Sequence, residues 1–306
     1  MLSYIAHRLV FGMLTIIGVS IVVFVIMRVL PGDPLVALFG PDGFTKLTEE
    51  QRAMYMADLG LSDPLWKQYL AWVGDVARGE FGRSFFRAES VADMIARRAP
   101  LTAQIAILSV LFSWLVGIPV ALISALKPNS VWDNVTRFFS ILFLAVPGFW
   151  FGYRAPLTGA PFFSDPLLNL QIVIGPAIVL GLGQAAYIAR MARSSLLEVI
   201  REDYVRTARA KGLSGRLVIV LHALPNALLP VITLSGILLG FVLAGSIPVE
   251  RAFGAPGLGD AMFIAVKERD VFVMQNLVFL YACVFVLLNI VVDVVIAWLD
   301  PRIRYQ

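Results

Sequence analysis

"EDYVRTARAKGLSGRLVIVLHALPN", residues 202–226, begins with the pattern of a charged helix. Residues 194–211 are rich in helix formers, and Glu202 and Arg206 have the i, i+4 spacing at which opposite charges attract. Arg209 and Lys211 fall in the last turn, where cations meet the negative end of the helix dipole. The sequence therefore predicts a helix over 194–211.

Gly212 is placed to end this helix, because glycine adopts the left-handed conformation of a helix C-terminus without steric cost. Ser214 can cap a second helix that runs towards Pro225. We therefore expect a helix, a sharp turn and a helix. The first helix has a basic rim and a small apolar stripe, which could lie against a membrane or fill a groove on another protein; the stripe consists of Leu197, Ile200, Tyr204, Val205 and Ala208.

The charged stretch lies in a chain of 306 residues that is 59% hydrophobic and 15% charged, a composition typical of membrane proteins. A helix that spans a bilayer needs about 20 mostly apolar residues. Six stretches without Asp, Glu, Lys or Arg approach this length, at 9–27, 99–126, 138–153, 166–189, 217–249 and 271–292. We expect an all-α integral membrane protein with six transmembrane helices, since a β-barrel would alternate apolar and polar residues.

The first apolar stretch is too long for a secretory signal, and no small-residue cleavage site precedes "MRVLPGDP", so we interpret it as a retained anchor. The single cysteine, Cys283, lies in the last apolar stretch, which leaves no disulfide or thiol-based metal site.

Basic residues in short loops predict the orientation, because such loops stay in the cytoplasm. The loop after the fourth stretch carries seven basic residues against Glu198, Glu202 and Asp203. Six spans then place both termini in the cytoplasm and the loops 154–165 and 250–270 outside. The basic residues on the cytoplasmic side are Arg8, Lys127, Arg137, Arg190, Arg193, Arg201, Arg206, Arg209, Lys211, Arg216, Arg302 and Arg304.

We divide the chain into a first transmembrane helix at 1–30, an external helical insert at 31–98 and a core transmembrane domain at 99–306 that includes the charged loop at 190–224. In the insert, residues 48–51 form a capping-box pattern, and Asp63 and Pro64 mark a helix start that Gly79 can end. The insert is interpreted either as a helical cap on the membrane domain or as a docking surface for an external partner.

Residues 208–226 resemble the coupling loop of ABC-importer permeases, whose signature is Glu-Ala-Ala, three residues, Gly, nine residues and Ile-x-Leu-Pro. Gly212 matches the signature glycine, and the segment 222–225 occupies the closing positions. The first three positions fall on Arg206, Thr207 and Ala208, so an arginine replaces the signature glutamate. This departure is similar to that of the peptide and nickel importers and puts in doubt any role assigned to the glutamate.

The resemblance covers nearly the whole chain. The segments "LPGDP" at 30–34, the run at 59–85, "PGLGDAM" at 256–262 and "LDPRIRY" at 299–305 are similar to the first permease type of the dipeptide and oligopeptide importers. The resemblance implies a type I importer fold in the bacterial inner membrane. It also implies four kinds of partner, namely a second, related permease in a heterodimer, two cytoplasmic ABC ATPases, an external binding protein and membrane lipid, with no nucleic acid.

The resemblance identifies the charged loop at 190–224 as a coupling loop and assigns ATPase coupling to its first helix and turn. The residues concerned are Glu202, Asp203, Tyr204, Arg206, Ala208, Arg209, Ala210, Lys211 and Gly212. No G-x-x-x-x-G-K-[ST] phosphate loop exists in the chain, so we expect ATP and Mg²⁺ to bind the partner subunits. The solute could be a dipeptide, an oligopeptide, a nickel chelate, glutathione, haem or an oligosaccharide.

The external loop 253–263 is rich in Gly and Pro and follows the fifth apolar stretch. The resemblance suggests an outer gate or a binding-protein contact there, and a tight re-entrant turn packed on the helices is the alternative. In both cases the glycines allow close backbone approach. The candidate residues are Phe253, Pro256, Gly257, Leu258 and Gly259.

Other function classes have little support in the sequence. A self-sufficient secondary transporter or channel would need its own coupling groups or pore, and a membrane enzyme would need a catalytic cluster. His7 and His222 are the only histidines, and neither has a carboxylate at ligand spacing. We therefore expect no catalytic residue and no metal site in this chain.

The third apolar stretch fits the six-span topology poorly. It has 16 residues, about 24 Å of helix, and Pro147 interrupts it. In similar permeases an apolar stretch continues beyond this point, so about half a helix is missing here. A natural shortening, an engineered deletion or residues absent from the sequence would each produce this, and a helix that begins at Asn134 would recover enough length to span.

Overall fold

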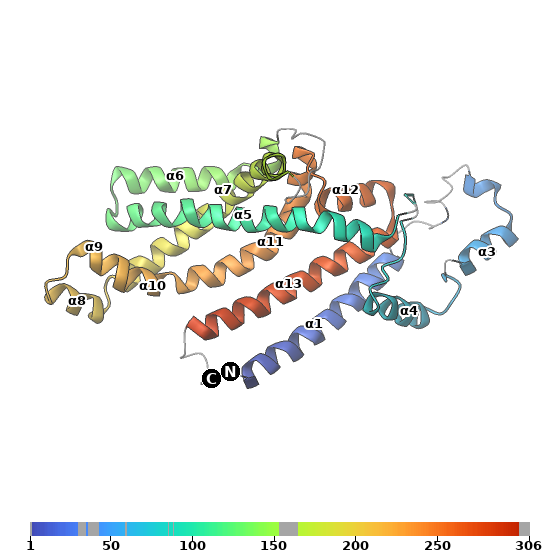
Figure 1. Ribbon diagram of the computed structural model, residues 1–306, viewed down its shortest axis with the longest axis horizontal. Coiled ribbons are helices and arrows are strands. Elements are labelled where there is room, and N and C mark those ends of the chain that lie inside the picture. The colour runs from blue at the N-terminus through green and yellow to red at the C-terminus, as the bar shows by residue number, and fades with distance from the viewer. Residues whose placement is uncertain are drawn as a thin grey trace.

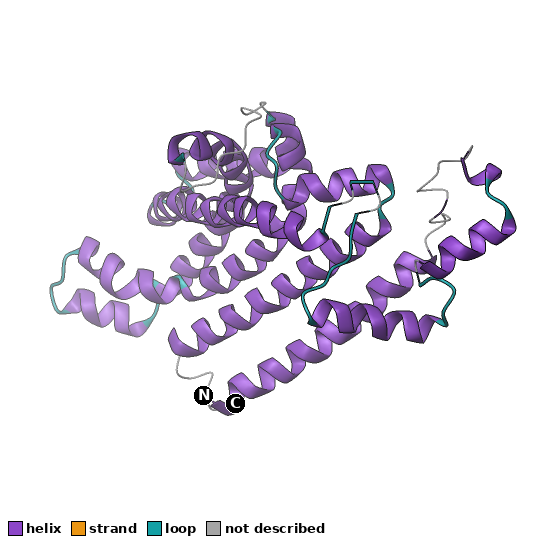
Figure 2. Cartoon of the chain, turned by 45° about the vertical axis from the view of Figure 1, so that its right-hand side comes forward, coloured by secondary structure: helices purple, strands orange, loops and turns teal. Residues whose placement is uncertain are grey.

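The computed structural model describes residues 2–29, 35, 43–58, 60–84, 86–87, 89–152 and 165–299. Helices joined by short loops make up this part of the chain (Figure 2). Within it no strand is present beyond one isolated bridge between Arg83 and Ser90. The all-α expectation is confirmed for the described residues.

Five helices of the described part are long and apolar enough to cross a membrane. They correspond to the expected apolar stretches apart from the third. Helix α5 begins eight residues before the apolar stretch at 99–126, because the charged residues Arg97 and Arg98 lie inside the helix. The five are α1 (Leu2–Val29), α5 (Val91–Leu126), α7 (Pro166–Val199), α11 (Leu229–Phe253) and α13 (Val271–Leu299).

The third expected span differs from the structure at both ends. Helix α6 (Val131–Ala145) has 15 residues, about 22 Å of helix, which is shorter than the roughly 30 Å core of a bilayer. It ends early because Val146 precedes Pro147 and adopts an extended conformation, as the proline ring requires. A short 3₁₀ helix, η1 (Gly148–Phe151), follows. The sixth span is therefore not confirmed, and the expected outer loop lies outside the described residues apart from residue 165.

Helices α5 and α7 pack along each other and form the centre of the structure (Figure 1). Small residues allow the close approach. A Cβ atom on Gly181 of α7 would lie 2.7 Å from the backbone oxygen of Ser109, and one on Gly117 of α5 would lie 2.9 Å from the backbone oxygen of Ala185. Such small-residue contacts are typical of packed transmembrane helices.

Helices α1 and α13 run side by side along the edge of the molecule (Figure 1). Near the chain ends, Arg8 of α1 forms a 2.8 Å ion pair with Asp293 of α13. At the other end of α1, an aromatic cluster attaches α4 (Leu65–Ala77): the Phe24 ring lies 5.5 Å from the Tyr69 ring, and Trp72 donates a 3.0 Å hydrogen bond to Asn276 of α13.

The insert is helical as expected. The capping box forms before α3 (Glu49–Asp58), since Thr48 and Gln51 exchange side-chain to backbone hydrogen bonds of 3.0 and 3.2 Å. Asp63 does not cap α4: Pro64 holds the cap position, and Asp63 instead pairs with Lys67 at 2.9 Å. The segment 30–34 and the terminal segment 300–306 lie outside the described residues, so the domain limit at 30 stays a prediction.

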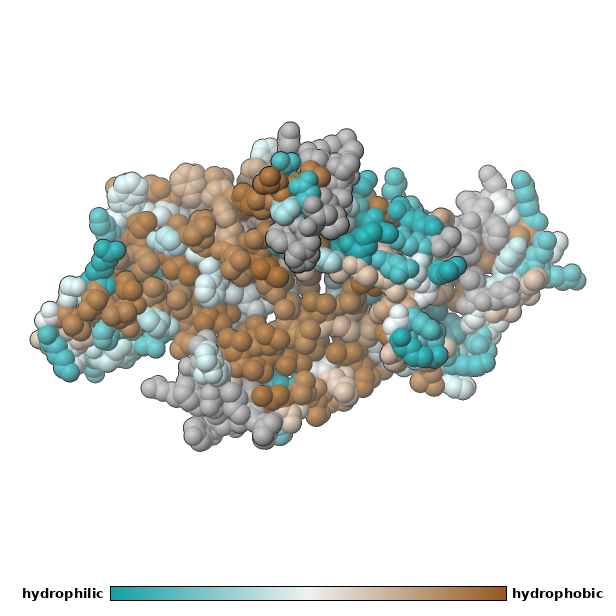
Figure 3. Space-filling model, in the orientation of Figure 1, coloured by the Kyte–Doolittle hydropathy of each residue, from teal (hydrophilic) through white to brown (hydrophobic). Residues whose placement is uncertain are grey.

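The polar ends of the molecule lie at opposite sides of an apolar middle. Figure 3 shows hydrophobic residues across the centre and hydrophilic residues at both ends. One end carries α8 (Asp203–Ala210) and α9 (Gly215–Leu217), and the other carries α12 (Leu258–Glu268) and the insert (Figure 1).

The glycine contacts between α5 and α7 provide a stability test. We expect Gly181→Ala to lower the thermal unfolding temperature of the detergent-solubilised protein, because the new methyl group meets backbone. Gly183→Ala is the matched control on the same helix, since nothing lies within 4 Å of its added Cβ. Equal melting temperatures for the two variants, measured by fluorescence-detected size exclusion, would contradict the packing described.

Candidate functional site

The coupling loop forms a helix, a turn and a helix between α7 and α11, as the sequence predicts. The first helix is interrupted, however: α7 ends at Val199, a turn covers 200–202, and α8 then begins at Asp203. Glu202 therefore precedes α8 and forms no i, i+4 pair with Arg206. The 3.5 Å partner of Arg206 is Asp203, one turn earlier on α8.

The turn between the two helices has the predicted chemistry. Gly212 has φ +82°, in the left-handed region that glycine adopts most easily. The Ser214 side chain accepts a 3.4 Å hydrogen bond from the backbone N–H of Leu217 and so caps α9. The helix continues as a π-helical segment (Val218–Ala223) and as α10 (Leu224–Ala227) into α11.

Part of the apolar stripe of the coupling loop packs against other residues of the same chain. Val205 and Ala208 of α8 pack against Val218 and Val199, and all but Val199 are fully buried. Ile200 packs with the α7 residues around Leu196. Val205 and Ala208 are therefore covered within the chain, whereas Leu197 and Ile200 of the stripe are partly buried and Tyr204 stays exposed.

Tyr204 links α8 to the second helix through its hydroxyl group. It accepts a 2.8 Å hydrogen bond from the Asn226 amide and donates one of 3.3 Å to the backbone oxygen of His222. His222 lies in the π-helical segment just before Pro225, whose ring and missing N–H disturb the hydrogen bonds of an ordinary α-helix. Tyr204 thus satisfies a carbonyl that this irregularity exposes.

The remaining candidate residues of the coupling loop form one exposed surface. Ala208 alone among them is buried. The surface also carries the neighbouring basic residues Arg201 and Arg216. The exposed candidates are Glu202, Asp203, Tyr204, Arg206, Arg209, Ala210, Lys211 and Gly212.

A buried carboxylate lies where the coupling loop joins the helix bundle. Asp133 at the start of α6 is fully buried and accepts hydrogen bonds from Arg193 of α7 at 3.1 and 3.0 Å and from Arg137 at 3.1 and 2.8 Å. The Ser124 hydroxyl of α5 and the Asn129 N–H also donate to it. Sequence reasoning missed this cluster, because its members lie on three helices.

Burial acts to raise the pKa of the Asp133 carboxyl, but the hydrogen bonds from Ser124, Asn129, Arg193 and Arg137 outweigh it, and the net pKa lies well below the usual range. Asp133 is therefore ionised at neutral pH. Its charge holds the ends of α5, α6 and α7 together.

A second buried carboxylate organises the turn between α11 and α12, residues 253–259, which is called the outer turn here after its predicted side of the membrane. Glu250 of α11 is fully buried and accepts hydrogen bonds from the backbone N–H groups of Gly259 and Asp260 at 2.7 and 3.1 Å. The Thr102 hydroxyl of α5 donates to Glu250 at 2.9 Å and accepts from Leu258 N–H at 2.8 Å. These contacts satisfy the N-terminal donors of α12.

The glycines of the outer turn are required by this arrangement. A Cβ atom on Gly257 would lie 2.3 Å from a Glu250 oxygen, and one on Gly259 would lie 2.8 Å from the Ile247 backbone. Phe253 and Leu258 are also buried, and Pro256 is partly buried. This is the packing of a tight turn on the helices, and a role of the five residues as an outer gate or a binding-protein contact stays a prediction.

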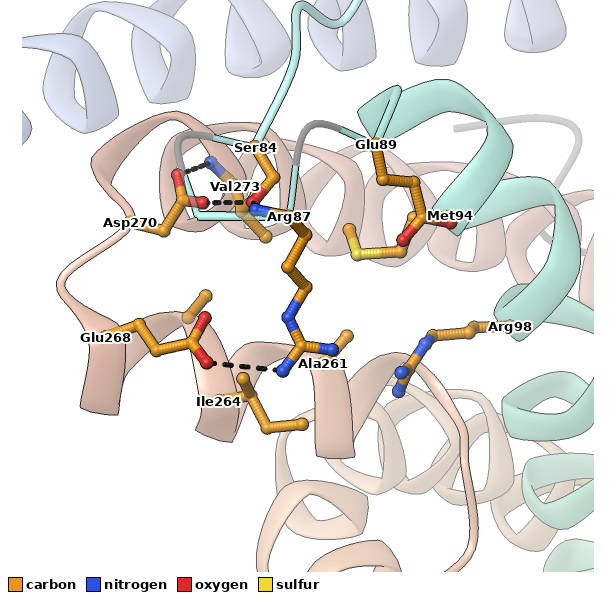
Figure 4. A pocket seen from close by; sticks show the side chains of 11 residues that line it. Ser84, Arg87, Glu89, Met94, Arg98, Ala261, Ile264, Glu268, Asp270 and Val273 are labelled. Atoms are coloured by element: carbon orange, nitrogen blue, oxygen red, sulfur yellow. Dashed lines mark hydrogen bonds and ion pairs between the residues drawn. The ribbon is translucent and has the colours of Figure 1, made fainter. Parts of the chain in front are cut away.

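The insert is tied to the outer turn around a small cavity of about 20 Å³ (Figure 4). Ser84 donates a 2.6 Å hydrogen bond to Asp270, and Arg87 pairs with Glu268 at 3.2 Å across the cavity. Nearby, Arg98 of α5 pairs with Asp260 at 3.1 Å. The cavity has about the size of one water molecule. The ion pairs of Arg87 and Arg98 beside it join the insert to α12.

The Thr102 contact can be tested by isosteric replacement. We expect Thr102→Val to lower the stability of the outer turn by about 1–3 kcal/mol, because Leu258 N–H and a Glu250 oxygen lose their partner. Hydrogen exchange at α12 should then increase. Thr102→Ser keeps the hydroxyl and is the control; the hydrogen-bond assignment fails if serine and valine accelerate exchange equally.

Comparisons with known proteins agree along the whole chain. Residues 117–305 match the model of the family "Binding-protein-dependent transport system inner membrane component", and residues 1–106 match the N-terminal model of such membrane components. The chain is 37% identical over 338 residues to a di/tripeptide transport system permease protein of Pseudomonas aeruginosa, with full coverage of both proteins. It is 35% identical over 341 residues to the dipeptide transport system permease protein of Escherichia coli, again with full coverage.

A third relative is an oligopeptide transport system permease protein of Bacillus subtilis, 35% identical over 320 residues with full coverage of both chains. Since this chain has 306 residues, all three alignments contain positions that have no counterpart here. This agrees with the expectation that the chain is shorter than similar permeases.

Among solved structures, an inward-facing MetNI methionine ABC transporter matches with a TM-score of 0.54 and 19% identity, covering 68% of this chain and 96% of the other. This likeness concerns the fold alone. The family matches, the full-length relatives and the helical membrane fold together show that the chain belongs to the inner-membrane permease components of binding-protein-dependent ABC transport systems.

Proposed function

We propose that this chain forms half of the translocation pore of an ATP-driven importer for short peptides. A second, related permease would form the other half, and an external binding protein would deliver the solute. The relatives in Pseudomonas aeruginosa and Escherichia coli are named for the transport of dipeptides or tripeptides, which supports short peptides as the solute class.

The coupling loop is the observation that carries the proposal. Val205 and Ala208 of its apolar stripe are buried within the chain, whereas Arg206, Arg209 and Lys211 stand exposed on α8 and in the turn after it. A surface of this kind is suited to a partner protein with a matching groove. We propose that the partner is an ATPase subunit, that two such subunits serve the two permeases, and that ATP and Mg²⁺ bind there.

Transmission of motion from the ATPase would follow from how the coupling loop is attached. Val205 and Val218 pack on each other, and Tyr204 hydrogen-bonds to the π-helical segment, so α8 and the second helix would move as one body. That body continues into α11 and joins α7 through a three-residue turn. Closure of the ATPases would therefore tilt α7 and α11 between inward-open and outward-open arrangements.

The orientation belongs to the same proposal. The coupling loop would face the cytoplasm, because it carries the basic excess. Figure 1 draws the start of α1 and the end of α13 towards the α8 end of the bundle and α12 towards the other, which supports cytoplasmic termini and an external α12. The outer turn around Phe253, Pro256, Gly257, Leu258 and Gly259 would then gate the external mouth or contact the binding protein.

The Gly212 turn tests coupling directly. We expect Gly212→Val to reduce ATP-dependent uptake of a labelled dipeptide at least several-fold in proteoliposomes that contain the complete transporter, since a β-branched residue is strained at φ +82°. ATP hydrolysis should persist, so that the two activities separate.

Gly215→Val is the matched control, because Gly215 has no positive φ and its added Cβ meets nothing within 4 Å. Normal uptake by the Gly212→Val transporter would argue against the coupling role. Loss of uptake in both variants would show that the loop tolerates no side chain at all.

The rival function, a self-sufficient transporter or channel, makes the opposite prediction for the isolated chain. Reconstituted alone in liposomes, the chain should give no dipeptide uptake above protein-free liposomes, because the pore needs a second permease and ATPases. ATP-independent uptake by the chain alone would favour the rival. The complete transporter in parallel liposomes shows that the assay works.

A further inference from the structure

A groove runs between α5, α6 and α7 from the α8 end of the bundle towards the membrane interior. It consists of two cavities of about 370 and 230 Å³. Both cavities are lined by Val120, Thr136, Ser140, Ala186 and Ala189, so the second continues the first along the same three helices. The coupling mechanism uses none of this space.

The polarity of the groove changes along its length. The larger cavity is lined by Ser124, Arg137, Arg190, Arg193 and Ser194, which lie near the α8 ends of their helices. The smaller cavity lies deeper along α5 and α7 and at the same level on a neighbouring face of α6. Its distinct lining residues are apolar or glycine; they are Val116, Gly117, Val135, Phe139, Phe143, Leu182 and Ala185. One end therefore suits an anion and the other suits a hydrocarbon chain.

The charge of the polar end is not balanced within the groove. Neither cavity is lined by Asp or Glu among the described residues. Asp133 lies beside the groove but is fully buried and hydrogen-bonded to Arg193 and Arg137. Arg190 is exposed, lies 5.4 Å from the Tyr187 ring, and has no carboxylate partner in the described part of the chain.

We propose that this groove binds an anionic phospholipid of the leaflet on the α8 side, with the phosphate near Arg190 and Arg137 and an acyl chain along Phe139 and Phe143. Basic pockets between transmembrane helices suit anionic lipid headgroups. A peptide solute fits less well, because its amino group would need a carboxylate that the groove does not supply. The proposal does not depend on the solute or on ATP coupling.

Native mass spectrometry of the complete purified transporter, titrated with phosphatidylglycerol or phosphatidylcholine, tests this proposal. We expect phosphatidylglycerol to bind more tightly, and Arg190→Gln to weaken its binding about five-fold, the effect of one basic residue near a membrane surface. Lys127→Gln is the matched control, because Lys127 is exposed at the end of α5 on the same side but lies outside the groove and outside the coupling surface. It should leave the affinity unchanged.

Ser140→Phe tests the apolar part, since Ser140 lines both cavities and a phenyl ring would fill them. It should reduce bound phosphatidylglycerol without changing the charge, and the mass of the intact complex reports in the same spectra whether the variant assembles. If the transporter with Ser140→Phe does not assemble, the Arg190→Gln result still tests the lipid-binding proposal.

Four results would overturn the proposal. Arg190→Gln and Lys127→Gln could weaken lipid binding equally, or both lipids could bind equally well. Millimolar inorganic phosphate or a dipeptide could displace the lipid, which would assign the groove to a free anion or to the solute path. Finally, lipid could bind the isolated chain and not the complete transporter, which would mean that the second permease covers the groove.

Discussion

The ion pair between Asp133 and Arg193 holds together the end of the helix bundle that carries α8. It joins α6 to α7 at 3.0 Å, and the Ser124 hydroxyl brings in α5. A buried charge is stable only when it is paired and hydrogen-bonded, and the fully buried Asp133 has Arg193, Arg137 and the Ser124 hydroxyl as its partners. The cluster holds the end of α7 only a few residues before the coupling loop leaves it, and the loop is therefore attached to a rigid base.

A buried carboxylate lies near each end of the bundle, and the two carboxylates bind different kinds of group. At the α8 end, Asp133 binds side chains of neighbouring helices. At the outer end, Glu250 binds backbone N–H groups of α12, and Thr102 extends this contact to α5. Between them, close glycine contacts hold α5 against α7. Two polar clusters with a tightly packed apolar middle would let α7 and α11 tilt as rigid rods while the termini of the rods stay connected.

The sequence predicted the features that a short stretch of chain determines locally. Bilayer thickness sets the length of apolar runs, which identified five spans, and the turn at Gly212 with its Ser214 cap followed from backbone preferences. The end of α6 was misplaced because Pro147 acts on Val146, and the Glu202–Arg206 pair was wrong because α8 begins only at Asp203. The two buried carboxylates could not be predicted, since Glu250 and Thr102 are 148 residues apart and no periodic pattern connects them.

We propose that the exposed surface of α8 contacts an ATPase subunit, and site-specific photo-crosslinking detects such a contact. A photoreactive residue such as p-benzoylphenylalanine would replace Arg209, which is exposed on α8, in the complete transporter in membranes. The same residue at Lys67, exposed on α4 at the opposite end, is the control. We expect position 209 to crosslink to an ATPase subunit and position 67 not to do so. Crosslinks from position 209 to the external binding protein, or to no protein at all, would contradict it.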